Sequence, residues 1–355
     1  MAEQQPKKVR IGFVGVGTMG QCAHLRNYAA LPECEVVALA ELRPNLAKQV
    51  AARYGVPRVY ASHEEMLAKE RLDGLVSAQQ FTRHGTLMPE LLKAGLPLFT
   101  EKPIAGSIQM GEKVVAAVKA SGAFLMVGYH KRSDPATMAM KRELGALKAS
   151  GELGPLRYVR ITMPAGDWIA GGFNDLIQAA DAPVTIPDDP PPSDMDEAAY
   201  SAYMAFVNYY IHQVNLMRHL LGEPYTVTFV DAAGVLLVGR SASGVTCAIE
   251  MSPYNTTVDW QESALVAFER GWLRLDLPAP LALNRPGRLT LFKDPDKGVP
   301  AQTLVPQLPW VHAMRQQAVN FIRAVRGEIP PMTDAAEALE DLRVAREYLR
   351  LRTGH

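Results

Sequence analysis

The sequence predicts an α/β domain with a doubly wound parallel sheet, followed by an α+β domain with an open, mainly antiparallel sheet. In the first third of the chain, short apolar runs alternate with helix-like stretches. These runs are apolar throughout, as in parallel strands that are buried on both faces. After about residue 150, strand-like runs follow one another with turns and no helices between them, which is typical of antiparallel sheets.

The elements expected in the first part are read from these apolar runs and from helical periodicity. The expected strands are Val9–Val14, Glu35–Ala40, Gly74–Ala78, Leu96–Thr100 and Phe124–Val127. The expected helical segments are Met19–Ala30, Leu46–Tyr54, Met88–Ala94 and Ile108–Ala120.

The second part contains four further strand candidates: Tyr225–Val230, Val235–Gly239, Val245–Met251 and Ala264–Phe268. In residues 272–277, WLRLDL, leucines alternate with polar or aromatic residues, which predicts a strand with one buried face, joined to its neighbour by a turn at Glu269–Gly271. Helices are expected over Met195–Leu221, Val311–Val325 and Asp334–Leu351. The proline-rich stretch Asp181–Asp194 is interpreted as a loop or lid.

Length and composition favour a soluble protein of two domains. The chain has 355 residues, more than one hydrophobic core usually serves, and its 37 basic residues balance 37 acidic ones. This balance gives no support to nucleic-acid or membrane binding. The three cysteines form no C-x-x-C pair and the histidines show no metal-ligand spacing, so neither disulfides nor a metal are expected. With no apolar leader or membrane-length run, a cytoplasmic location is expected.

The stretch VGVGTMG at residues 14–20 fits the pattern G-x-G-x-x-G. It follows a predicted strand and opens a predicted helix, which is the context of a dinucleotide-binding loop. Gly15 would permit the tight turn, Gly17 would let the backbone approach a pyrophosphate, and Gly20 would allow close helix–strand packing. The alternative is a glycine-rich turn in some other α/β protein.

An acidic residue at the end of the second strand supports the dinucleotide interpretation. Glu41 lies 21 positions after Gly20, where a carboxylate can accept the ribose hydroxyls of NAD and repel a 2′-phosphate. NAD is therefore favoured as the cofactor. Arg43 leaves NADP as an alternative, because an arginine can pair with that phosphate.

The stretch GLPLFTEKPIA at residues 95–105 places Glu101 and Lys102 directly after a predicted strand. In open α/β sheets, ligands bind at the carboxyl ends of the strands. A surface ion pair is the alternative interpretation.

Taken in order, these motifs resemble the oxidoreductase family named for glucose–fructose oxidoreductase, inositol dehydrogenase and MocA (Gfo/Idh/MocA). The resemblance includes VGYHKRSDP at residues 127–135 and IHQVNLMRHLLGEP at 211–224, and it spans residues 8–350. It implies an NAD-binding Rossmann domain over 1–127 and a substrate-binding and oligomerisation domain over 128–355. It also implies a homodimer or homotetramer and a cis bond between Lys102 and Pro103.

The resemblance further implies site residues. Cofactor contacts are expected from Gly15, Gly17, Thr18, Met19, Gly20, Glu41, Arg43, Gln80, His84, Glu101 and Lys102. Substrate contacts are expected from Lys102, Arg132, Trp168, Asn208 and His212. Lys102, His212 and Tyr210 are the expected catalytic groups, with His212 as the acid/base that exchanges a proton with the substrate hydroxyl.

Helical geometry gives an independent argument for part of this set. On one continuous helix, Asn208, His212, Asn215 and His219 would fall within about 60° and form one polar stripe. A structural histidine is the alternative interpretation of His212. The chain also departs from the family pattern, because Asn208 and Asn215 stand where many members have aspartates and Tyr210 stands where a glycine is usual.

The resulting interpretation is a dehydrogenase or ketoreductase that uses NAD and acts on a sugar, sugar derivative or polyol. Two alternatives stay open. One is an enzyme that retains NAD and cleaves a glycosidic bond through transient oxidation, and the other is a non-catalytic regulator that binds NAD and a sugar.

Overall fold

The computed structural model describes residues 7–182, 184–252, 254–296 and 298–354, and its contacts divide the chain into two compact units. Unit 1 contains Met1–Gly128, Gly172–Met195 and Gln317–Glu340. Unit 2 contains Tyr129–Gly171, Asp196–Gln316 and Asp341–His355. The chain thus returns twice to unit 1 after residue 128. The functional division into a cofactor domain and a substrate domain stays a prediction.

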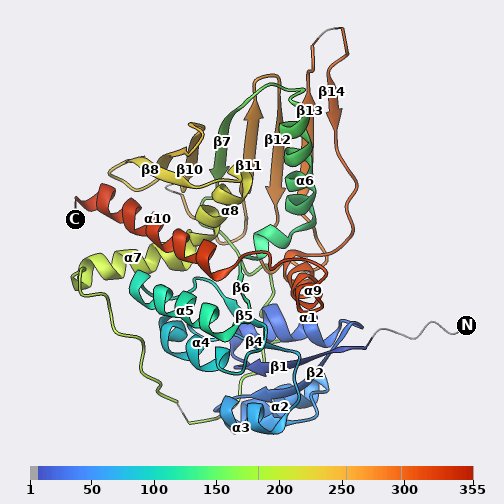
Figure 1. Ribbon diagram of the computed structural model, residues 1–355, viewed down its shortest axis with the longest axis vertical. Helices are drawn as coiled ribbons and strands as arrows, with labels where there is room; N and C mark the ends of the chain where they lie inside the picture. Colours follow the sequence, from blue (N-terminus) through green and yellow to red (C-terminus); the bar gives the residue numbers. More distant parts are fainter. Residues whose placement is uncertain (1–6, 183, 253, 297, 355) are drawn as a thin grey trace, which may run out of the picture. The chain divides into compact units, whose positions relative to one another are not determined.

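Unit 1 is built on a six-stranded, wholly parallel sheet of order β3-β2-β1-β4-β5-β6 (Figure 1). Its strands are β1 Val9–Val14, β2 Cys34–Ala40, β3 Val59–Tyr60, β4 Gly74–Ser77, β5 Leu98–Glu101 and β6 Leu125–Gly128. The order reverses at β1, as in a Rossmann fold, so the carboxyl ends of β1 and β4 form the switch point. The predicted doubly wound sheet is confirmed. Only the two-residue β3 was not predicted, since it is too short to make an apolar run.

The helical elements of unit 1 follow most of its strands. They are η1 Gly20–Leu25, α1 Arg26–Ala29, α2 Pro44–Tyr54, α3 His63–Lys69, η2 Phe81–Arg83, α4 His84–Leu92 and α5 Ile108–Ser121. The helix predicted from Met19 begins as the π-helical turn η1 and continues as α1. π-helical turns are rare and occur often at functional sites.

Aromatic rings from distant parts of the sequence fill the core of unit 1. Phe321, which is fully buried, lies edge-on to Tyr28, Phe99 and Phe124 with ring centroids 5.8–6.3 Å apart. Phe13 of β1 contacts Tyr28 in the same way at 5.4 Å. Edge-to-face pairs add to the free energy gained by burial alone. The last segment of unit 1 is therefore part of its core.

The predicted loop at Asp181–Asp194 contains no helix or strand among its described residues. Two of its aspartates bind helix starts in unit 1. The Asp181 carboxylate accepts the backbone N–H groups of Asn45 and Leu46 at 2.9 Å, and Asp189 accepts that of Gly85 at 2.7 Å. Carboxylates are favourable there because the first N–H groups of a helix have no partner within the helix.

Unit 2 contains an eight-stranded sheet of order β14-β13-β12-β11-β7-β10-β9-β8 (Figure 1). All its neighbouring strands are antiparallel except β7 and β10, which confirms the predicted open, mainly antiparallel sheet. Leu273 and Leu275 of β12 are fully buried while Arg274 between them is exposed, as their alternation predicts. The strands are β7 Leu156–Thr162, β8 Tyr225–Val230, β9 Leu236–Ser241, β10 Thr246–Glu250, β11 Glu262–Phe268, β12 Gly271–Leu277, β13 Arg288–Lys293 and β14 Gln302–Leu304.

Helix α6 packs against β12 and β13, and α8 packs against β7 and β10. The remaining elements are η3 His130–Ser133, α6 Pro135–Ser150, α7 Glu197–Tyr209, α8 Ile211–Leu221, α9 Ala313–Val325 and α10 Ala335–Thr353. Both α9 and α10 have residues in each unit. Among the described residues, no helix has the length and apolar character needed to cross a membrane.

The prediction of a single helix over Met195–Leu221 is wrong. The chain forms α7 and α8, which are separated at Tyr210, where ψ is −3°. The Tyr210 hydroxyl donates to the carbonyl of Met251, at 3.1 Å. Asn208 therefore lies on α7, apart from the other three residues of the predicted stripe.

Candidate functional site

The glycine loop follows β1, and a Cβ atom at each of its three glycines would meet different surroundings. Gly15 has a φ of +86°, and a Cβ there would lie 2.0 Å from Nε2 of Gln79. At Gly20 a Cβ would lie 2.8 Å from the carbonyl oxygen of Gly15. At Gly17 it would meet only the guanidinium of Arg43, at 3.7 Å. Gly15 and Gly20 are thus required by the turn, whereas the space at Gly17 suits the close approach of a ligand.

Glu41 comes directly after β2, and the residue is 8% exposed. Its carboxylate accepts the Val16 N–H at 3.0 Å, and the Arg43 guanidinium donates to it from Nε at 2.8 Å and from Nη2 at 3.0 Å. Burial acts to raise the pKa of Glu41, but the hydrogen bonds from Arg43 and Val16 and the positive charge of Arg43 together outweigh it, so the pKa lies below its ordinary value. The acidic group and the cation that bear on cofactor choice thus form one bidentate pair.

Glu101 ends β5, and its strongest partner is His24 of η1, a residue that sequence reasoning missed. His24 is 2% exposed, and its Nε2 donates to Oε1 of Glu101 at 2.5 Å. Burial acts to raise the pKa of Glu101, but the hydrogen bond and charge of His24, together with Lys102, outweigh it and lower this pKa. Oε2 of Glu101 accepts the backbone N–H of Lys102 at 3.2 Å, and the bond between Lys102 and Pro103 is cis, as expected. The turn after the glycine loop is therefore bonded directly to the EKP segment, residues 101–103.

The other predicted cofactor residues of unit 1 differ in how much of each is exposed to solvent. Thr18 and Gln80 are exposed and Met19 is half-buried. His84 is fully buried, with Nδ1 at 3.0 Å from the carbonyl oxygen of Pro103 and Nε2 at 3.3 Å from that of Gln79. Burial lowers the pKa of His84. The neutral ring of His84 thus supports the EKP segment from within the protein.

In unit 2, His212 of α8 is half-buried between two other rings. The ring of His130, from η3, lies 4.6 Å away at 71°, and that of Tyr129 lies 5.9 Å away at 89°. Neighbouring imidazoles in a partly buried place suit proton transfer near neutral pH. Asn208 is exposed, and Trp168 is half-buried in a segment without helix or strand.

Arg132, two residues after His130, is 3% exposed, and its Nε donates to Oδ1 of Asn215 at 2.6 Å. The neighbouring Lys131 forms an ion pair with Glu262, whose other oxygen accepts from Gln213 of α8 at 2.7 Å. Short helix η3 is thus fixed to α8 and β11 by buried polar contacts.

Tyr210, at the break between α7 and α8, is half-buried. Burial raises the pKa of its hydroxyl to about 12. The phenol is consequently protonated at neutral pH and donates to Met251.

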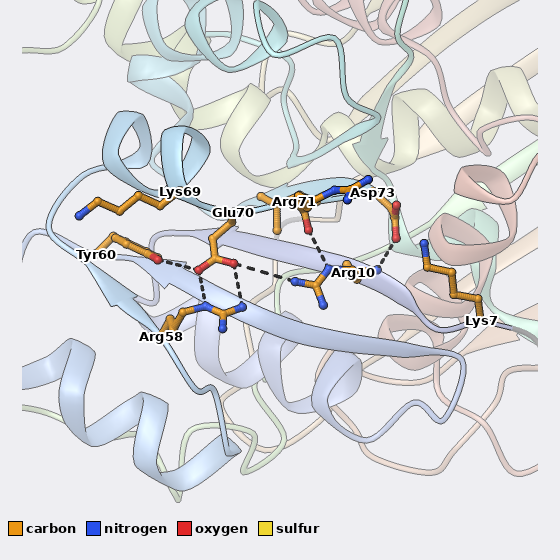
Figure 2. Close-up of a pocket in the computed structure, with 9 residues that line it drawn as sticks. Lys7, Arg10, Arg58, Tyr60, Lys69, Glu70, Arg71 and Asp73 are labelled. Atoms are coloured by element: carbon orange, nitrogen blue, oxygen red, sulfur yellow. Dashed lines mark hydrogen bonds and ion pairs between the residues drawn. The ribbon is translucent and has the colours of Figure 1, made fainter.

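A cavity of about 630 Å³ lies beside the amino ends of β1 and β4, whereas the glycine loop lies at the carboxyl end of β1 (Figure 2). It is lined by Lys7, Arg10, Arg58, Tyr60, Lys69, Glu70, Arg71, Leu72 and Asp73. Most of its charges are paired, since Glu70 accepts from Arg58 and from Tyr60, and Arg10 pairs with Glu35 at 2.7 Å. We assign this cavity no binding role. Among the described residues, no group of three His, Cys, Asp or Glu side chains is placed to hold a metal ion.

Comparison with known proteins supports the oxidoreductase interpretation. Residues 9–129 match the family model GFO_IDH_MocA, described as an oxidoreductase family with an NAD-binding Rossmann fold. The chain is 23% identical to the uncharacterized oxidoreductase YrbE of Bacillus subtilis over 66% of this chain and 60% of that protein. It is 32% identical to an inositol 2-dehydrogenase of Acidothermus cellulolyticus over 39% of this chain and 41% of that protein. The match thus spans less than two thirds of the length of either relative.

The whole chain shares its fold with solved structures. An oxidoreductase domain protein from Kribbella flavida superimposes with a TM-score of 0.74 over 98% of this chain and 97% of that one, at 17% identity. The resemblance inferred from the ordered motifs is confirmed: residues 9–129 match the model of the Gfo/Idh/MocA family, and the chain shares the fold of solved oxidoreductase structures.

Proposed function

We propose that the chain is an NAD-dependent dehydrogenase or reductase acting on a carbinol or keto group of a sugar, sugar derivative or polyol. The observation that carries the proposal is the bond between His24 and Glu101. It connects the turn that follows the glycine loop to the residue beside Lys102, and so couples a nucleotide-binding element to a candidate catalytic amine. The inositol 2-dehydrogenase relative supports the polyol class.

The residues present fit a dinucleotide. Gly17 leaves room for the pyrophosphate, and Glu41 with Arg43 would contact the adenosine ribose. Thr18, Met19, Gln80 and Glu101 are the further cofactor contacts we propose, with His84 acting from behind the EKP segment. When bound, NAD supplies the acceptor or donor of hydride.

Two side chains carry the proton chemistry in this proposal. In oxidation, His212 takes the proton from the hydroxyl oxygen of the substrate, and the ammonium of Lys102 stabilises negative charge that develops in the substrate. In reduction, His212 returns the proton to that oxygen. Arg132, Trp168 and Asn208 are proposed to contact the substrate, and Tyr210 is proposed as a neutral hydrogen-bond donor. A homodimer or homotetramer and a cytoplasmic location also remain proposals.

The first test is a panel of sugars and polyols that includes myo-inositol, offered with NAD and NADP while the absorbance of the reduced nicotinamide is followed. Oxidation of at least one compound is expected. Turnover of a glycoside without net formation of NADH would support the glycosidase alternative. Binding of NAD and a sugar with no turnover would support a regulator.

The second test replaces the proposed catalytic groups. Lys102→Ala and His212→Gln should each lower kcat by about 10²–10⁴-fold, with the affinity for NAD nearly unchanged. Lys48→Ala, which removes an exposed lysine of α2, is the matched control. Wild-type turnover in either catalytic variant would remove that residue from the mechanism.

A further inference from the structure

Asn215 lies one helical turn after His212 on α8 and is bonded to a cation and to an anion. Its Oδ1 accepts from Nε of Arg132 at 2.6 Å, and its Nδ2 donates to Oδ2 of Asp341 at 2.7 Å. Asp341, on α10, also forms an ion pair with Arg218. All four side chains belong to residues that are at most 8% exposed. They form a continuous buried chain of polar contacts within unit 2.

The hydrogen-bonding groups on either side of residue 215 explain why this residue is an amide. The guanidinium only donates hydrogen bonds and the carboxylate only accepts them, so the residue between them must accept on one side and donate on the other. An aspartate at 215 would place two carboxylates in direct contact inside the protein, which disfavours both charges. An apolar residue would take a hydrogen-bond partner away from both Arg132 and Asp341.

The same contacts bear on the candidate catalytic histidine. Helix η3 carries both Arg132, which is bonded to Asn215, and His130, whose ring lies against that of His212. Residues 212 and 215 are on one face of α8, and residues 130 and 132 are on one short helix. The bond at Asn215 therefore fixes the segment whose histidine packs on His212.

We propose that Asn215 and Asp341 are positioning residues: Asp341 holds the Asn215 amide, which fixes Arg132 and with it η3 against His212. The link to substrate chemistry rests on the proposed function. The link between Asp341, Asn215 and Arg132 is tested without any substrate.

The first experiment exchanges the amide and the carboxylate. Asn215→Asp should lower the melting temperature by roughly 10 °C because it opposes two buried carboxylates, and Asp341→Asn by a similar amount because it removes the buried carboxylate that pairs with Arg218. The double variant Asn215→Asp/Asp341→Asn exchanges the two groups. Between Arg132 and Arg218 it places a carboxylate and then an amide, so each contact again joins a donor to an acceptor, and most of the loss should be recovered. Glu340→Gln, at an exposed neighbour on α10, is the control.

The second experiment reports on Arg132 directly. In protein labelled with ¹⁵N-arginine, the Nε–H of Arg132, assigned by its absence in Arg132→Lys, should exchange slowly with water. Asp341→Leu removes the anchor of Asn215 and should speed this exchange at least about 10-fold, whereas Glu340→Gln should leave it unchanged. With a substrate from the panel, Asp341→Leu should raise KM more than it lowers kcat.

Two results would overturn the proposal. One is additive loss of stability in the double variant, which would show that residues 215 and 341 are not coupled. The other is unchanged exchange at Arg132 in a folded Asp341→Leu protein. If no compound on the panel is turned over but the exchange and stability results hold, the proposed function fails and the positioning chain stands.

Discussion

The glycine loop of unit 1 and the His212 region of unit 2 are both candidate functional elements, but they are assembled differently. The loop lies within seven consecutive residues, and its sequence signal is contained in them, although the side chains of Gln79 and Arg43 lie nearest to Gly15 and Gly17. The surroundings of His212 come from η3, α8 and α10, with Asn215 and Asp341 separated by 126 positions. The glycine loop should tolerate substitutions in distant parts of the sequence. The His212 region should be sensitive to them, because it depends on side chains from several distant segments. Substitutions in the two regions can test this difference.

The largest effect on stability is expected from Gly15→Ala, and Gly17→Ala is the variant with which it is compared. The first puts a Cβ 2.0 Å from Nε2 of Gln79 at a φ of +86°, so a loss of about 1–3 kcal/mol in unfolding free energy is expected. The second has room within the protein, so the melting temperature should stay close to that of the wild type while the affinity for NAD falls at least about 10-fold. Thermal unfolding and titration with NADH measure the two effects. Equal NADH affinity in Gly17→Ala would show that the open space does not serve the cofactor.

The next effect concerns Asp134, the residue that caps α6 in unit 2. Its carboxylate is 1% exposed and accepts the N–H groups of Ala136 and Gly287, yet burial dominates and raises its pKa to about 6. Because this pKa is higher in the folded than in the unfolded state, its contribution to stability is full below about pH 4. That contribution, up to about 3 kcal/mol, is lost as the pH rises through about 6.

Asp134→Asn removes this titration and retains one capping oxygen. As the pH rises from 4 to 7, the unfolding free energy of the wild type should therefore fall relative to that of the variant. A constant difference across that range would contradict the raised pKa.

A smaller effect is expected at His24, whose bond to Glu101 is a contact between residues far apart in the sequence. His24→Leu leaves Glu101 buried without its main donor, so the pKa of Glu101 should rise and the acidic limb of kcat/KM should move to higher pH. We expect a loss of about 10–100-fold near pH 6 and a smaller loss at pH 8. His24→Gln, which keeps an N–H donor, is the matched control. Identical pH profiles for His24→Leu and wild type would separate His24 from the reaction.

The smallest effect is a change of cofactor preference at Glu41 and Arg43. Arg43→Ala removes the cation that could pair with a 2′-phosphate, so the Kd for NADPH should rise about 10-fold while that for NADH changes little. Glu41→Gln should do the reverse and favour NADPH. Fluorescence titration with both cofactors measures the ratio, and an unchanged ratio in both variants would remove this pair from cofactor selection.

The contrast between local and long-range contacts explains which features could be predicted from the sequence. Strands β1, β2 and β4–β6, the glycine loop and Glu41 were predictable because their signals lie in runs of adjacent residues. The contact between His24 and Glu101 spans 77 positions and depends on the turn η1, which no periodicity predicts. The break at Tyr210 was missed because neither glycine nor proline marks it, and the partner of the Tyr210 hydroxyl lies 41 positions away. Asn215 could be recognised as a departure from the family, but its reason became visible only with Asp341.

The aromatic core of unit 1 has a consequence for synthesis of the chain on the ribosome. Phe321 closes the cluster of Tyr28, Phe99 and Phe124, although these three rings are made long before it. Until that late segment emerges, the nascent parallel sheet exposes the apolar surface that Phe321 will cover. The first unit to be translated is therefore completed only late in synthesis, and during this interval its uncovered apolar surface is open to chaperone binding.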